Sequence, residues 1–154
     1  MSSPLLGYTS TSIKETAMNH FLFKTEPSEY SFADLLAQGQ GVWDGVRNPV
    51  ALRNMREMTK GDPVFVYHTG SEKAVVGVAR ATSAAYPDPK QPSDTRLFVI
   101  DLAPVRALPR PVNLAALKAH PEFASSPLVR QGRLSVVRLT ASQAAIIGKL
   151  GGDK

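Results

Sequence analysis

The single tryptophan of the chain lies in an unusual polar segment, residues 41–48, with the sequence GVWDGVRN. An indole ring can stack on a planar ligand such as a nucleobase, an interaction worth about 1–3 kcal/mol per base. Arg47 and the free amides of a helix that starts after Asn48 attract phosphate or a polar base edge. The segment therefore indicates planar-ligand binding through Trp43, Arg47 and Asn48. A core anchor whose N–H finds a backbone partner is the alternative for Trp43, and it is the commoner role of a lone Trp in a small domain.

Polar side chains directly follow the apolar run at residues 20–24. Lys24 can meet a phosphate, while Thr25 and Glu26 can hydrogen-bond a base edge, because a carboxylate suits an exocyclic amine. The change from apolar to charged residues indicates a strand end at a surface or cleft. A plain ion pair at the strand terminus is the alternative interpretation.

A second apolar run, which begins at residue 63, also ends in residues with polar groups, namely Tyr67, His68 and Thr69. His68 also allows a small hydrolase, with His68 as general base and Asp44 or Glu26 as the orienting carboxylate. The sequence has no Gly-x-Ser-x-Gly elbow, no Walker-type phosphate loop, and three His residues without metal-ligand spacing. We therefore expect no catalytic residue, no metal and no cofactor, and the hydrolase is kept as an alternative.

Basic residues offer a face for a polyanion. The net charge is +5, and residues 81–154 carry ten Lys or Arg against five Asp or Glu, whereas residues 19–80 carry seven of each. Because phosphate contacts release counterions, the C-terminal half is predicted to hold a nucleic-acid backbone. The turn at residues 131–135 adds Arg133, which can face phosphate, and Ser135, which can bond a ligand edge. A solvated basic surface without a partner is the alternative.

Length and composition indicate one folded domain, since the chain has 154 residues, 43% of them hydrophobic and 20% charged. The absence of Cys excludes disulfides, thiolate zinc sites and a cysteine nucleophile. No stretch reaches the roughly 18 apolar residues of a membrane span, and the N-terminus lacks a secretory signal, so we expect a cytoplasmic or nucleoid-associated protein. Residues 1–18 are interpreted as a disordered tail, or residues 1–17 as an upstream extension with Met18 the natural first residue.

The elements that must position these residues alternate irregularly. Helix caps predict helices at 31–36, 48–58, 114–120 and 140–150, with capping boxes at Ser31 and Thr140. Strands are predicted at 20–24, 63–68, 74–81, 97–102 with extended chain towards 105, and 134–139, the second and third forming a hairpin. Without a regular βαβ alternation, a curled mixed sheet decorated by helices fits best.

An ordered series of motifs resembles the EVE domain family over nearly all of residues 19–150. The motifs that carry this resemblance are Phe23-Lys24-Thr25-Glu26-Pro27, Trp43-Asp44-Gly45-Val46-Arg47-Asn48, Arg53-Asn54, Gly61-Asp62, Phe65-Val66-Tyr67-His68, Val76-Gly77, Ala85-Tyr86-Pro87-Asp88 and Arg133-Leu134-Ser135-Val136. The resemblance implies an α+β fold, a PUA-like mixed β-barrel of five to six strands flanked by short helices, spanning residues 19–152. It also implies kinship with YTH domains, which read methylated adenine in RNA.

The function implied by this resemblance is a non-catalytic reader that holds a modified nucleobase in a pocket. A modified cytosine in DNA is the favoured ligand, an RNA reader in the YTH manner is the first alternative, and no protein partner is assigned. The ligand-binding residues carried over are Lys24, Thr25, Glu26, Trp43, Arg47, Asn48, Tyr67, His68, Thr69 and Ser135. The expected backbone contacts are Arg53, Arg130 and Arg133.

Overall fold

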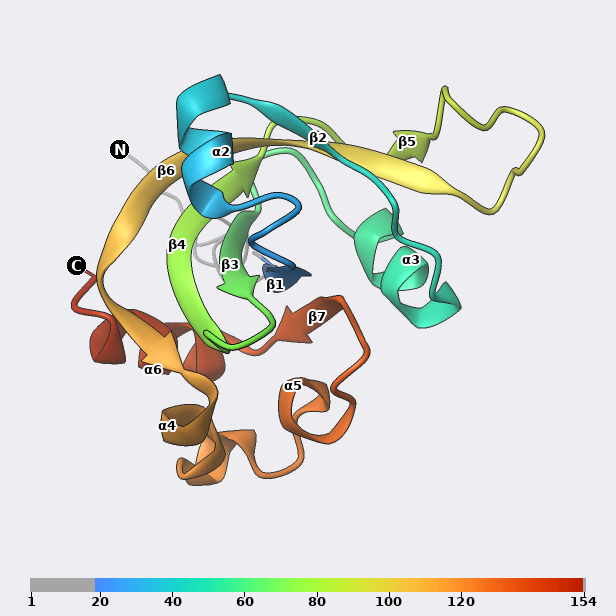
Figure 1. Cartoon of the computed structure of the whole chain (residues 1–154). Coiled ribbons are helices and arrows are strands. Elements are labelled where there is room, and N and C mark those ends of the chain that lie inside the picture. The colour runs from blue at the N-terminus through green and yellow to red at the C-terminus, as the bar shows by residue number, and fades with distance from the viewer. Residues whose placement is uncertain (1–18, 154) are drawn as a thin grey trace, which may run out of the picture.

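The computed structural model describes residues 19–153, which form a curled, mixed sheet of seven strands surrounded by short helices (Figure 1). The strand order is β2-β6-β4-β3-β1-β7, with β5 paired to β6. β2 and β7 stand at the two ends of this order, so the sheet is a half-barrel with an opening between its edges. The predicted α+β class, a curled mixed sheet flanked by short helices, is confirmed, with seven strands where five to six are expected. The predicted tail, residues 1–18, lies outside the described residues.

The centre of the sheet brings two strand ends together. β1 (His20–Thr25) pairs in parallel with β3 (Pro63–His68), with Lys24 opposite Tyr67 and Thr25 opposite His68. Because parallel strands end at the same edge of a sheet, the polar residues that follow β1 and β3 are neighbours. On its other side β1 pairs antiparallel with β7 (Val136–Leu139).

The other half of the sheet is built around one long strand, β6 (Phe98–Asn113). It pairs antiparallel with β4 (Ala74–Ala81), which forms the hairpin with β3, and also with β2 (Gly41–Trp43) and β5 (Tyr86–Pro87). The pairing of β4 with β6 shifts register between Val75 and Gly77, and such bulges bend a strand. β6 therefore curves round the molecule and carries β2 over the open side of the half-barrel (Figure 1).

Two helices lie near the opening. α2 (Phe32–Gln38) starts with the predicted capping box of Ser31 and Asp34 and ends at Gly39, which has φ +77°. α3 (Pro49–Arg56) starts at Asn48, whose side-chain oxygen accepts from the amides of Val50 and Ala51. Because Asn54 donates to the Val136 carbonyl at 2.8 Å, α3 is tied to β7 across the opening.

The remaining helices cover the other end of the sheet. They are α4 (Leu114–Lys118), the 3-10 turn η1 (Pro121–Phe123), α5 (Pro127–Arg130) and α6 (Ala141–Leu150), the last with the predicted capping box of Thr140 and Gln143. Within residues 19–153, none of the helices is both long enough and apolar enough to cross a membrane.

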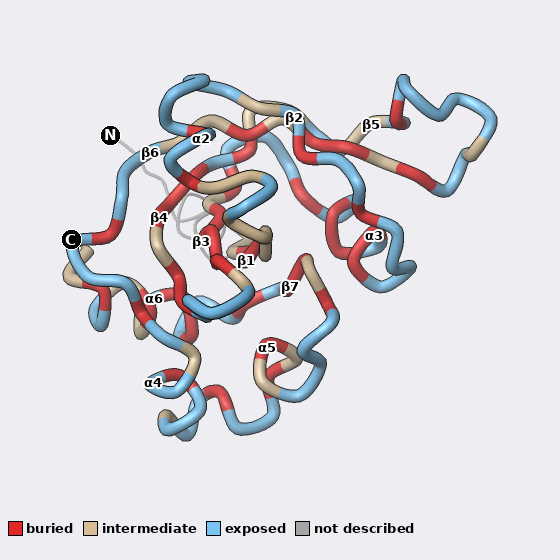
Figure 2. Tube along the Cα trace, viewed as in Figure 1, coloured by how far each residue is buried: buried red, intermediate tan, exposed pale blue. Residues whose placement is uncertain are grey.

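Buried residues concentrate on the central strands and on the inner faces of the helices (Figure 2). Phe21, Leu22 and Phe23 of β1 are fully buried. α2 packs on the sheet through Phe32, whose ring lies so close to Gly77 that a Cβ there would be 2.5 Å from it. Gly77 therefore sets the close approach of α2 to β4.

Predicted elements with their own sequence signals appear within a few residues of their expected bounds. β3 and β4 match, whereas the strand predicted at 134–139 begins two residues later and β6 extends eleven residues past 102. β2, β5, η1 and α5 were not predicted, because each is four residues or shorter and lies among Gly or Pro. β6 was predicted too short because Pro104, Pro109 and Pro111 argue against a strand, whereas its register shifts accommodate them.

Candidate functional site

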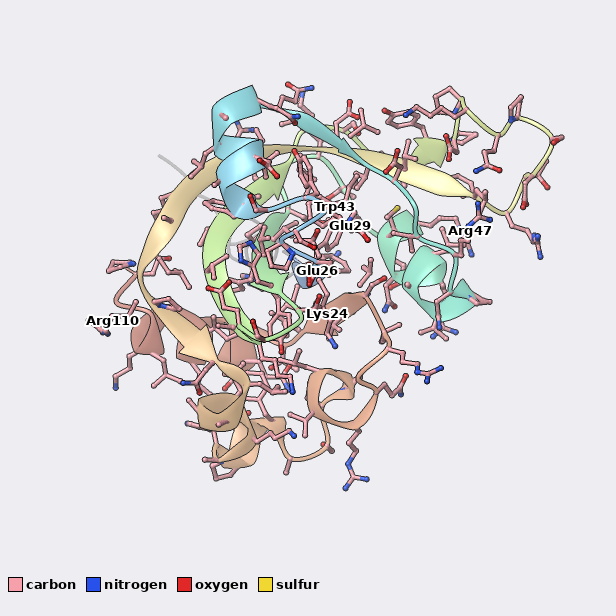
Figure 3. The ribbon with its side chains drawn as sticks, in the orientation of Figure 1. Lys24, Glu26, Glu29, Trp43, Arg47 and Arg110 are labelled. Carbon is pink, nitrogen blue, oxygen red and sulfur yellow. The ribbon has the colours of Figure 1, made fainter. Side chains whose placement is uncertain are left out.

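A cleft of about 510 Å³ lies where the two edges of the open sheet face each other. The end of β1 forms its base, β2 and the following loop form one side, and the residue before β7 forms the other. Figure 3 shows Trp43, Glu29, Glu26 and Lys24 following one another through this central region. The residues that line the cleft are Lys24, Thr25, Glu26, Glu29, Tyr30, Gln38, Val42, Trp43, Asp44, Gly45, Val46 and Ser135.

Trp43 is largely committed to packing inside the fold. Its ring meets Phe23 at 5.5 Å between centroids with a tilt of 60° and meets Tyr30 edge-on at 5.8 Å. Only 7% of the residue is exposed, although it lines the cleft. The core-anchor interpretation therefore agrees with the structure, and the use of Trp43 as a stacking platform stays a prediction.

Lys24 and Thr25 are held by backbone carbonyls from neighbouring segments. The Lys24 ammonium donates to the Gly132 carbonyl at 3.0 Å and lies 5.7 Å from the centroid of the Tyr67 ring. Burial lowers the pKa of Lys24 because it disfavours the charged ammonium. The Thr25 hydroxyl donates to the Tyr30 carbonyl at 2.6 Å, which leaves its oxygen as an acceptor towards the cleft.

Carboxylates outnumber cations in the lining. Lys24 is its one cation, against Glu26, Glu29 and Asp44, so the lining carries a formal charge of −2. Glu26 accepts from the Ser28 hydroxyl at 2.6 Å and from the Ser28 amide at 2.8 Å, and these hydrogen bonds lower its pKa. The cleft is thus acidic at neutral pH, which favours a ligand edge with N–H donors and disfavours phosphate.

The structure places His68 outside the cleft, where both ring nitrogens have partners. Nε2 accepts from the Phe32 amide at 3.0 Å, so Nδ1 carries the proton and donates to Glu72 at 2.8 Å. His68 is 8% exposed and supports the start of α2. It is not positioned to take a proton from a ligand in the cleft, so the geometry does not support His68 as the base of the hydrolase alternative.

Tyr67 and Thr69 also lie behind the lining. Tyr67 is 4% exposed, and the Lys24 ammonium lies over its ring. The amide of Thr69 donates to the Thr25 carbonyl at 2.9 Å, which ties the two strand ends together. These two residues and His68 are brought next to the predicted pocket as a supporting layer and do not line it.

Arg47 and Asn48 follow Trp43 in the same loop, but neither residue lines the cleft. The Asn48 side chain is used as the cap of α3. Arg47 is exposed and lines two neighbouring hollows instead of this cleft, and Figure 3 shows it beside α3.

The three arginines predicted to contact a backbone are spread over the surface. Arg53 lies exposed on α3, and Arg130 donates to the Ala124 carbonyl at 3.1 Å. Arg133 is exposed in the turn between Gly132, which binds Lys24, and Ser135, which lines the cleft.

Sequence reasoning missed the contribution of the turn and helix after β1. Glu29, Tyr30 and Gln38 line the cleft, and the Tyr30 hydroxyl donates to Gln38 at 2.7 Å. The turn itself is closed by the amides of Glu29 and Tyr30, which both donate to the Glu26 carbonyl. The Pro27-Ser28 pair is the sequence signal that could have shown this turn.

A second cleft, of about 560 Å³, lies between β3, β4 and α6 and is lined mainly by apolar residues. It contains no predicted site residue. Its one arginine, Arg106, is paired with Asp153. Within the described residues, 19–153, no group of three or more His, Asp or Glu side chains is arranged to hold a metal ion.

Comparison with known proteins matches the EVE domain family model to residues 19–150. Thymocyte nuclear protein 1 of mouse is 30% identical over 158 residues, covering 81% of this chain and 70% of the mouse protein. The human protein of the same name is 29% identical over 144 residues, covering 77% of this chain. The chain spans only 64% of the length of that human relative.

Solved structures share the fold over most of this chain. Atu2648 of Agrobacterium tumefaciens is 34% identical with a TM-score of 0.84, covering 88% of this chain and 94% of its own. Rpa0253 of Rhodopseudomonas palustris is 38% identical with a TM-score of 0.82 and the same coverage. Human THYN1, solved in complex with 5-methylcytosine-containing DNA, is 26% identical with a TM-score of 0.80, covering 88% of this chain and 99% of its own.

Proposed function

This chain belongs to the EVE domain family, and we propose that its acidic cleft holds one modified nucleobase of DNA, with a modified cytosine as the favoured base and no chemical change to it. The observation that supports the proposal is that a relative of the same fold was solved with 5-methylcytosine-containing DNA. The cleft of this chain is where we place the corresponding base. The acidic lining is compatible with such a ligand because the amine of cytosine is a donor and Glu accepts from it.

The base would enter edge first, after leaving the stack of its strand. Extrusion costs a few kcal/mol, which contacts in the pocket must offset. Glu26 and Glu29 are the acceptors for the exocyclic amine, and Thr25 and Ser135 offer hydroxyls to the remaining edge. Trp43 lines the cleft and supplies an apolar wall.

The proposal is tested by titrating the protein with matched single-stranded oligomers that carry one central cytosine, methylcytosine, hydroxymethylcytosine or methyladenine, as DNA and as RNA, at fixed salt. We expect tighter binding of a modified cytosine in DNA. Glu26→Gln should weaken that preference, because it removes the charge of the acceptor and keeps its shape. Glu122→Gln, exposed in η1 and outside the lining of the cleft, serves as the charge-matched control.

Equal binding of all oligomers would end the proposal, and preference for methyladenine in RNA would replace it with the YTH-like alternative. Turnover of any oligomer, abolished by Glu26→Gln, would make the protein an enzyme.

A further inference from the structure

Next to the acidic cleft lies a second hollow of opposite charge. It has a volume of about 440 Å³, and its lining contains three arginines and no acidic residue. We call it the arginine cleft. The residues that define it are Arg47, Arg56, Arg96, Leu52, Leu97 and Phe98.

The two clefts are connected along the chain and in space. A small hollow of about 150 Å³ shares Asp44, Gly45 and Val46 with the acidic cleft, and Arg47 and Leu97 with the arginine cleft. Trp43 and Arg47 are four residues apart, so their Cα atoms are separated by at most about 14 Å. A short stretch of one nucleic-acid strand can therefore occupy both.

The cations of the arginine cleft are largely available to a ligand. Arg96 forms a local ion pair with Asp94 at 3.0 Å, whereas Arg47 and Arg56 form no ion pair with the carboxylates of residues 19–153. Arg56 lies over the ring of Phe98 at 5.4 Å, a geometry in which an aromatic ring steadies a guanidinium. Its planar donors are thereby held ready for a phosphate.

The floor of the arginine cleft is apolar. Leu52 and Leu97 are buried, and Phe98 is half-buried with part of its surface open to the cleft. An apolar, partly aromatic floor under a cationic rim fits a nucleotide better than a bare anion, because a base can pack on the floor while its phosphate meets the rim.

From this arrangement we propose that the arginine cleft binds the nucleotide that flanks the extruded base on the same DNA strand, with its phosphate on Arg47 and Arg56 and its base against Phe98. This inference rests on the proposed function of the acidic cleft. In this proposal the two clefts have different roles because their charges differ. The acidic lining hydrogen-bonds the base edge and repels phosphate. The arginine cleft binds phosphate, and its affinity does not depend on the base modification.

The test compares Arg56→Gln, Arg47→Gln and the double variant with the wild type. The ligands are the nucleoside 5-methyldeoxycytidine and two nine-nucleotide single-stranded DNAs, one with a central methylcytosine and one without modification. Binding is measured at several salt concentrations. Arg110→Gln is the matched control, because Arg110 lies on β6 at the opposite side of the molecule from Arg47 (Figure 3).

Each single variant is expected to weaken binding of both nine-mers about fivefold to tenfold at low salt. Each should also lower the salt slope of log affinity by about 0.7, the value for one phosphate contact on a single strand. Nucleoside binding and the ratio between the two nine-mers should stay unchanged, and Arg110→Gln should behave as the wild type.

Unchanged nine-mer affinity in the double variant would overturn the inference, and so would an equal loss of nucleoside binding, which would make these arginines part of the base pocket. Displacement of the nine-mer by an acidic peptide of equal charge at equal concentration would also overturn it. Failure of the proposed function has a different signature, since the wild type would then bind both nine-mers equally.

Discussion

Ser28 and Glu26 illustrate how single residues set the charge of the acidic cleft. Ser28 donates twice to the Glu26 carboxylate, and its hydroxyl makes the larger contribution to the lowered pKa. A lowered pKa keeps the carboxylate ionised as the pH falls below the ordinary value of 4.5. If Glu26 binds the base as proposed, binding should be present at higher pH and be lost as the pH falls through the pKa of Glu26.

Ser28→Ala should therefore shift the acid limb of binding to higher pH. The variant removes the hydroxyl donor and lets the Glu26 pKa rise towards its ordinary value. Affinity for the methylcytosine nine-mer as a function of pH measures the shift, and an NMR titration of the Glu26 carboxyl assigns it. Ser71→Ala, in the neighbouring exposed turn, is the control. Identical pH profiles for both variants would contradict this assignment.

His68 is a second residue whose surroundings decide its role. Its Nε2 is the acceptor for the Phe32 amide in the first turn of α2. We expect His68→Ala to lower the free energy of unfolding by about 1–3 kcal/mol, since a buried amide loses its partner. Urea unfolding measures this, with His20→Ala at the start of β1 as the comparison. A fully stable variant would show that the hydrogen bond contributes little.

At the scale of elements, the hairpin turn between β3 and β4 supports the acidic cleft from outside its lining. Gly70 has φ +79°, and a Cβ on it would lie 2.6 Å from Oε1 of Glu26. Gly61 has φ +99°, with nothing within 4 Å of the equivalent Cβ. The two glycines therefore share a positive φ that would be strained for any other residue, but only Gly70 lies beside Glu26.

Gly70→Ala and Gly61→Ala make a matched pair. Both should lower stability by about 1 kcal/mol, because Ala is disfavoured at positive φ. Only Gly70→Ala should weaken binding of the methylcytosine nine-mer, since its methyl group displaces the Glu26 carboxylate. Thermal unfolding and oligomer titration on the same samples separate the two effects. Equal binding by both variants would argue that Glu26 does not meet the base.

At the scale of the whole molecule, tertiary structure changes what the charge count implies. The C-terminal half holds the excess of basic residues, but Arg106 is paired with Asp153, and Arg138 with Glu57 at 2.5 Å. The arginine cleft takes two of its three arginines from the N-terminal half. Most of the cationic groups in this cleft, which lies next to the acidic cleft, therefore belong to the half whose net charge is zero.

Arg106→Gln and Arg138→Gln should consequently change nine-mer affinity by less than about twofold, because exposed ion pairs leave little free charge for phosphate. A filter-binding titration at low salt, where long-range electrostatics are strongest, is the most demanding measurement. A loss as large as that expected for Arg56→Gln would restore the C-terminal half as the backbone-binding face.

Local signals in the sequence were sufficient for most of the individual elements. Ser31, Asn48 and Thr140 cap helices as predicted, since a cap depends only on the residues within one turn of it. The hairpin of β3 and β4 was predicted for the same reason. The predicted convergence of Lys24, Thr25, Glu26, Trp43 and Ser135 on one cleft also agrees with the structure, although their contacts with a ligand stay predictions.

Only the tertiary structure decided which polar residues line the acidic cleft and which support the fold. His68 and Thr25 lie opposite each other in the register of β1 and β3, yet one points to α2 and the other lines the cleft. The opening between β2 and β7, the acidic balance of its lining and the neighbouring arginine cleft all join residues distant in sequence. Side-chain partners and charge balance arise from packing between segments that are far apart in the sequence. A linear pattern of residue types does not say which of these segments lie close together in space.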